Sequence, residues 1–145
     1  MPIQLDDPQR QRIRAMVEEV GRAMVAKDLR RVAEMTASWL PEYGEEGWRQ
    51  HIEQQLSEMA SEWGLEGPTW PTQFEVDSNP LSFEELVALK RQFPKGLDGS
   101  SFRQRMHLTL MPDEGAFDFD YWCRWWLAVV EENGLLKIGA VEVEP

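Results

Sequence analysis

The sequence predicts an α+β fold in which N-terminal helices pack on one face of a curved antiparallel sheet. Apolar residues recur every three or four positions through residue 63, which is the period of amphipathic helices. From residue 101 onwards they alternate at every second position, which is the period of strands. The 145 residues, 42% hydrophobic and 28% charged, suit one globular unit, so we expect a single domain over 1–145.

Two helices are expected in the first part of the chain. Asp7-Pro8 combines an acidic N-cap with proline at the first helical position, and it starts a helix that runs to about Lys27. Asp28 can cap a second, short helix, which Pro41–Gly44 ends. The apolar stripes of these helices are Ile13, Met16, Val17, Val20 and Met24, followed by Leu29, Val32 and Met35.

The middle of the chain changes from helical to strand periodicity. A third helix is expected over 45–63. Thr72–Asp77 then alternates, with Phe74 and Val76 on one side, and this pattern predicts a strand. Phe83–Gln92 follows a capping-box pattern that predicts a short helix, and a strand is the competing interpretation there.

The last part of the chain predicts an antiparallel meander of three strands, over Ser101–Met111, Ala116–Glu131 and Leu135–Val143. Pro112–Gly115 separates the first two strands. Asn133-Gly134 separates the last two, and this dipeptide favours a tight hairpin because both of its residues accept a positive φ.

A four-residue turn at 112–115 would determine how the first two strands of the meander pair. It places Leu110 opposite Phe117 on an apolar inner face, and His107 opposite Asp120 on the outer face. The same register pairs Gln104 with Cys123, Arg105 with Trp122, and Arg103 with Arg124.

The last hairpin needs an irregularity. An unbroken ladder would place Glu142 opposite Trp125 in the core. A bulge near Gly139 would instead turn Val141 and Val143 inward, and we favour the bulge because it keeps a carboxylate out of an apolar environment.

This order of elements resembles the nuclear transport factor 2-like superfamily, which includes ketosteroid isomerases, scytalone dehydratases and limonene epoxide hydrolases. The similarity lies in the helix from Pro8, Lys27-Asp28-Leu29 at the start of the second helix, the helix around Trp48–Trp63, and the final hairpin Trp125–Gly139. The resemblance implies a cystatin-like cone with a pocket between helices and sheet, and dimers through the convex face. It implies no single reaction, because one fold carries many functions.

The chain departs from the family's enzymes at the positions that would carry catalysis. The isomerases use a tyrosine of the first helix and acids that line the pocket, whereas the first helix here has no tyrosine and the inner strand face has no aspartate. The Asp-Arg-Asp set of the epoxide hydrolases is matched in type by Asp118, Arg105 and Asp120, which the expected register turns outward. The expected helix at Phe83–Gln92 is a further departure.

Three groups of residues are candidates for a functional site. Candidates for catalysis are His107, Asp120 and Tyr121, because a carboxylate beside an imidazole can orient it for proton transfer. Candidates for a ligand pocket on the inner and helical sides are Tyr121, Gln104, Cys123, Tyr43 and His51. Candidates for a dimer interface on the outer sheet face are Trp122, Trp126, Arg103, Arg105 and Arg124, since Trp and Arg are enriched at association surfaces.

Charge and composition exclude several classes of partner. The net charge of -11 argues against binding to nucleic acid or to an anionic membrane. One cysteine and two histidines predict no zinc site, and the sequence carries no cofactor motif. The N-terminus lacks a secretory signal pattern and no stretch is long and apolar enough to span a bilayer, so we expect a cytoplasmic location.

These observations favour a non-catalytic pocket domain that binds a small, largely apolar ligand or a protein partner, and that forms a homodimer. Two alternatives stay open. The first is an isomerase-, dehydratase- or hydrolase-type enzyme that uses the cone pocket. The second is an acidic interaction protein of the immunity type, whose charge would complement a basic partner.

Overall fold

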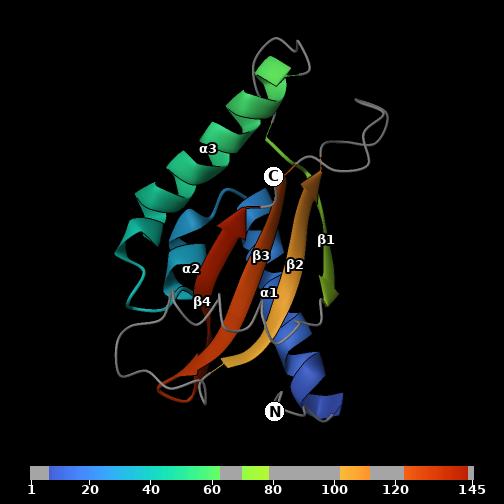
Figure 1. The fold of residues 1–145 in the computed structure, drawn as a ribbon, viewed down its shortest axis with the longest axis vertical. Helices are drawn as coiled ribbons and strands as arrows, with labels where there is room; N and C mark the ends of the chain where they lie inside the picture. The colour runs from blue at the N-terminus through green and yellow to red at the C-terminus, as the bar shows by residue number, and fades with distance from the viewer. Residues whose placement is uncertain (1–6, 63–69, 79–101, 112–122, 144–145) are drawn as a thin grey trace.

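Helices cover one face of a four-stranded antiparallel sheet (Figure 1). The computed structural model describes residues 7–62, 70–78, 102–111 and 123–143. Its elements are α1 (Asp7–Val25), α2 (Leu29–Glu34), the short 3-10 helix η1 (Pro41–Tyr43), α3 (Glu45–Glu62), β1 (Gln73–Ser78), β2 (Phe102–Met111), β3 (Cys123–Glu132) and β4 (Leu135–Val143). The α+β class predicted from periodicity is confirmed, and the expected helix at Phe83–Gln92 lies outside the described residues.

The turn between α1 and α2 shows how the chain changes direction without glycine. Lys27 has a φ of 61°, and its N–H and that of Asp28 bond back to the carbonyls of Met24 and Ala23. This pair of bonds satisfies the last carbonyls of α1. The Asp28 carboxylate then accepts from the N–H of Arg31 at 3.3 Å, so the predicted cap of the second helix is confirmed.

The core lies between the helices and the inner face of the sheet, which is the face that the helices cover. The largest side chains buried there belong to Trp48 of α3 and Trp125 of β3, both at 0% exposure. The indole N–H of Trp48 donates to Thr36 Oγ1 at 3.0 Å, so burying this ring leaves no donor unsatisfied. At roughly 1.5–3 kcal/mol for each fully buried large side chain, this layer is the main source of stability.

The predicted register between β2 and β3 is wrong. Leu108 pairs with Trp125 instead of Phe119, six residues further along the chain, and β3 begins at Cys123. The observed register builds an inner-face row of four apolar residues across the sheet, from Val76 through Leu108 and Trp125 to Val143. Because the shift is an even number of residues, the side chains from Gln104 to Leu110 keep their predicted faces, whereas the bulge between Phe102 and Gln104 pairs Phe102 with Val130 instead of Trp125.

The hairpin between β3 and β4 matches its prediction. Asn133 and Gly134 have φ values of 53° and 79° and connect Glu132 to its partner Leu135. The register shifts at the position of Gly139, so that Leu127 pairs with Val141 and the bulge favoured from the sequence is confirmed.

The two edges of the sheet differ in what pairs with them among the described residues. Along β4, the segment after α2 adds a parallel bridge between Thr36 and Ile138, and the N–H of Ala37 donates to the Ile138 carbonyl at 2.8 Å. Ser38 Oγ also bonds to the Glu132 carboxylate at 2.6 Å. The other edge is β1, and no other strand among the described residues pairs beyond it (Figure 1). One edge is therefore capped by the segment after α2, and along the other edge the described residues place no further strand.

Candidate functional site

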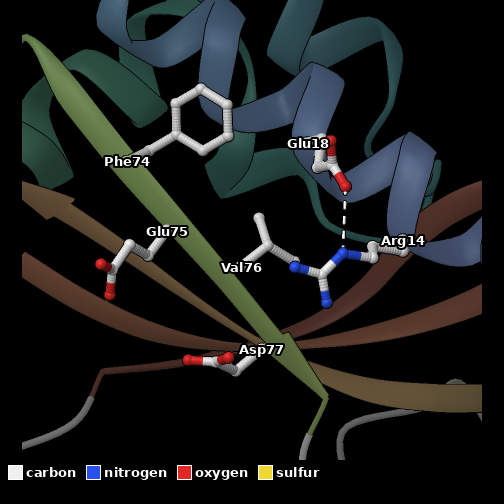
Figure 2. Close-up of a pocket in the computed structure, with 6 residues that line it drawn as sticks. All are labelled: Arg14, Glu18, Phe74, Glu75, Val76 and Asp77. Carbon is white, nitrogen blue, oxygen red and sulfur yellow. Dashed lines mark hydrogen bonds and ion pairs between the residues drawn. The ribbon is translucent and has the colours of Figure 1, made fainter.

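A groove lies between α1 and the open edge strand β1 (Figure 2). Its volume is about 460 Å³. Both of its walls belong to elements whose position the core determines, because α1 buries its apolar stripe against the sheet and β1 pairs with β2 along its whole length. The lining residues are Arg14, Glu18, Phe74, Glu75, Val76 and Asp77.

A glycine determines where the groove begins. A Cβ placed on Gly21 of α1 would lie 2.6 Å from Cδ2 of Phe74, so helix and strand touch at this point. One and two turns towards the helix N-terminus, Glu18 and Arg14 stand on the flank of the buried stripe and form the wall of the groove. The groove therefore extends from the contact between Gly21 and Phe74 at one end to the side chains of Glu18 and Arg14 at the other.

The helical wall of the groove is an ion pair that can rearrange. Arg14 Nε lies 3.1 Å from Glu18 Oε1, one turn apart on α1. The side chains are 54% and 38% exposed, and pairs of this kind contribute at most about 1 kcal/mol. The guanidinium or the carboxylate can turn towards an incoming group at little cost in stability.

The strand wall has two chemically distinct sides. Phe74 and Val76 point towards α1, and Val76 is 5% exposed (Figure 2). Glu75 and Asp77 point to the opposite side and are exposed. With Glu18, three carboxylates and one guanidinium line the groove, so the site carries a net negative charge.

A second cluster lies on the outer face of the sheet, which is the face away from the helices. The His107 and Trp126 rings stack with centroids 4.4 Å apart, and the Arg105 guanidinium lies 4.3 Å from the Trp126 ring centroid. Arg105 and His107 are only 7% and 6% exposed, and Thr109 beside them is also buried. The contact between the Arg105 guanidinium and the Trp126 ring stabilises this cluster.

The cross-strand partners of His107 differ from the predicted register. His107 pairs with Trp126 on β3 and with Asp77 on β1, because β2–β3 pairing begins six residues later than expected. Asp120 and Tyr121 lie outside the described residues, as does Trp122. Among the described residues, the carboxylate that shares a row with the imidazole is that of Asp77.

The remaining residues of the predicted dimer face also have other partners. Arg105 pairs with Ala128 instead of Trp122, and Arg124 pairs with Thr109 instead of Arg103. Arg103 sits at a bulge in β2, and its guanidinium lies 2.8 Å from the Glu131 carboxylate.

Two residues of the predicted ligand pocket come together. The rings of Tyr43 and His51 stack with centroids 4.5 Å apart, where η1 meets α3. Burial raises the pKa of the Tyr43 hydroxyl above its usual 10.0, and the Glu42 carboxylate adds to the rise. Gln104 pairs with Val129 instead of Cys123, which is the partner of Leu110. None of these residues lines the groove beside β1.

The groove contains residues that sequence reasoning did not select. The alternation of Gln73 to Asp77 identified β1 and its two sides, but it carried no information on which strand pairs with it. The spacing of Arg14 and Glu18 is that of a helical ion pair, which is common on solvated helix surfaces. Only the antiparallel pairing of β1 with β2 brings these residues to one open edge.

Metal-binding clusters and membrane-spanning helices are both absent from the described residues. No group of three or more His, Cys, Asp or Glu residues in the described part of the chain could hold a metal ion. Within the same residues, no helix has the length and apolar character needed to cross a bilayer. No family model, no curated protein and no solved structure matches this chain.

Proposed function

We propose that the protein is a non-catalytic binding domain and that its ligand is another protein, held along the groove between α1 and β1. The observation that carries this proposal is the groove beside β1, an edge strand beyond which no other described strand pairs. Exposed strand edges bind extended segments through backbone hydrogen bonds, and a neighbouring groove receives alternate side chains.

The interior favours a protein partner over a small apolar ligand. Leu108, Trp125 and Leu127 point from the sheet towards the helices, are at 0% exposure and belong to the apolar core. The described groove is instead lined by four charged residues and two apolar ones. Such a lining suits a polypeptide better than a small, largely apolar molecule.

The experiment is a selection from a displayed library of short peptides, followed by binding measurements on two matched variants. Glu18→Trp fills the groove, and Glu53→Trp adds the same ring to an exposed position on α3. We expect the selected peptides to bind the wild type and Glu53→Trp but not Glu18→Trp. Equal binding to both variants would place the site elsewhere. Stabilisation by hydrophobic small molecules alone, with no peptide selected, would refute the proposal.

An enzyme that uses the outer face is the second candidate, and one observation favours it. Asp77, His107 and Trp126 form one row across three strands, so a carboxylate and an imidazole are neighbours. The row is tested with a panel of ester and epoxide substrates. Turnover that is lost in both His107→Gln and Asp77→Asn, with the melting temperature retained, would establish this function, and absence of turnover in the wild type would exclude it.

Membership of the nuclear transport factor 2-like superfamily and homodimerisation stay predictions. The order of three helices followed by a bulged antiparallel meander supports the first. For the second, Arg105 is buried and Trp126 is partly buried in a single chain, so shielding them does not require a second copy. Sedimentation of the wild type and of Trp126→Glu tests the dimer: a dimeric parent and a monomeric, folded variant would support it, and a monomeric parent would contradict it.

A further inference from the structure

We infer that the segment bound at the β1 edge is an extended stretch of another protein in which basic and apolar residues alternate. This inference rests on the proposed function and adds to it the chemistry of the partner. It follows from three features of the groove: the backbone of β1 on the side where no described strand pairs, the different chemistry of the two sides of β1, and the repulsion that a second copy would meet.

The backbone provides the frame for binding. β1 runs from Gln73 to Ser78 and pairs on one side with β2. On its other side no described strand follows, whereas the opposite edge of the sheet is capped by hydrogen bonds from the segment after α2. A strand added to β1 would have its side chains pointing alternately to the two faces of the sheet.

On the helix side, the added strand would meet an apolar floor. Phe74 and Val76 point there, and the Arg14–Glu18 pair forms the opposite wall at the edge of the about 460 Å³ groove. Every second side chain of the partner therefore enters a space between an apolar strand and the stems of two charged residues. Aliphatic side chains suit this position because the long stem of Arg14 can pack against them.

On the other side, the added strand would meet two carboxylates. Glu75 and Asp77 are exposed and stand two residues apart on the same side of β1. The partner's side chains on this side are the direct neighbours of these carboxylates, and oppositely charged neighbours across strands are favourable. Two basic residues spaced by one position in the partner therefore complement β1.

The same charges argue against a second copy of this chain as the occupant. If β1 paired with β1 of another copy, Glu75 and Asp77 of both copies would share one side of the joined sheet. Like charges on neighbouring strands destabilise the pairing. The net charge of -11 on each chain adds a long-range repulsion.

The test measures binding of the full chain to three labelled synthetic peptides by fluorescence anisotropy. The first peptide alternates lysine with valine, the second alternates glutamate with valine, and the third has the composition of the first with its lysines contiguous. Hydrogen exchange on the same samples reports whether amides of residues 70–78 become protected. We expect binding of the first peptide, with protection of β1, and at least about tenfold weaker binding of the other two.

Two double variants distinguish the effect of the carboxylates on β1 from the effect of the net charge of the chain. The double variant Glu75→Lys with Asp77→Lys should reverse the preference and bind the glutamate–valine peptide. Glu53→Lys with Glu58→Lys makes the same change of net charge at exposed positions on α3 and should leave the preference for lysine intact. Equal loss of lysine–valine binding in both double variants would show that only net charge matters, and it would overturn the inference.

The outcomes distinguish this inference from the proposed function. If peptides bind with protection of β1 but without preference for alternating lysine, the binding function stands and the inference fails. If no peptide protects β1, both fail. If β1 becomes protected on raising the concentration of the protein alone, a second copy is the occupant and the inference is wrong.

Discussion

Gly21 shows how a single missing side chain positions two elements. It lies within the buried stripe of α1, where the ring of Phe74 occupies the space that a Cβ would need, at 2.6 Å from Cδ2 and 2.8 Å from Cγ. Glycine in the middle of a helix costs about 1 kcal/mol relative to alanine. The close packing of α1 on β1 therefore offsets a local preference against this residue.

The sign of the effect of Gly21→Ala tests this account. Helix propensity alone predicts stabilisation by about 1 kcal/mol, whereas the clash with Phe74 predicts a loss of about 1–3 kcal/mol. We expect the loss in urea unfolding experiments. Ala15→Gly, at an exposed position of the same helix, measures the propensity term alone. A stabilised Gly21→Ala variant would show that helix and strand do not touch here.

Tyr43 gives a prediction about pH. Because burial raises the pKa of its hydroxyl above 10.0, the folded state holds the phenolic proton more tightly than the unfolded state does. The resulting stabilisation is fully present below pH 10 and is lost as the pH rises through the folded-state pKa. In Tyr121→Phe, which leaves Tyr43 as the one tyrosine, ultraviolet titration should give a tyrosinate midpoint above 10. A midpoint at or below 10 would mean that the hydroxyl is fully solvated.

At the scale of elements, the final hairpin contains two glycines with different roles. Gly134 is required by its φ of 79°, and nothing lies within 4 Å of the position that its Cβ would take. Gly139 has no such conformational requirement, but its Cβ would lie 2.5 Å from Cγ1 of Val130. The Asn-Gly pattern predicts the role of Gly134 from the sequence. The role of Gly139 depends on how the bulge brings β3 and β4 together.

A double-mutant cycle tests the contact at the bulge. Gly139→Ala should destabilise the protein by about 1–3 kcal/mol because the new Cβ would overlap the methyl groups of Val130, which is at 0% exposure. In a Val130→Ala background, which lacks both contacting methyl groups, the same change should cost clearly less. Chemical unfolding of the four proteins gives the coupling energy. Additive effects would contradict the contact.

The strand periodicity and the β3–β4 hairpin were predictable, and the β2–β3 pairing was not. Alternation located β1, β2 and β4 to within one residue, because the period of a strand is a local property of the chain. The β2–β3 register required the length of the connection, and a shift of six residues left the face assignments from Gln104 to Leu110 unaltered. The apolar pattern repeats at every second residue, so it does not distinguish registers that differ by an even number.

At the scale of the whole molecule, net charge is the dominant electrostatic term. The ion pairs of the described residues, such as Arg31 with Glu19 at 2.7 Å, are largely exposed and contribute at most about 1 kcal/mol each. A net charge of -11 destabilises the compact state by self-repulsion, and salt screens that repulsion.

We therefore expect the melting temperature to rise when sodium chloride is increased from low to physiological concentration. Calorimetry at constant pH measures the shift. An uncharged osmolyte at equal osmolality is the control for effects that do not depend on charge. A fall in melting temperature with salt would show that the surface ion pairs outweigh the repulsion between carboxylates.

The sequence by itself determined the helices, the strands, the turn at Asn133-Gly134, the bulge at Gly139 and the side of each strand that faces the core. All of these depend on residues close together in the chain or on their periodicity. The tertiary structure decided that Asp77 pairs with His107, that Arg105 is buried, and that Arg14, Glu18, Phe74 and Val76 line one groove beside β1. These arrangements depend on which distant strands pair and on where α1 touches the sheet, and that choice is made by the packing of the whole core.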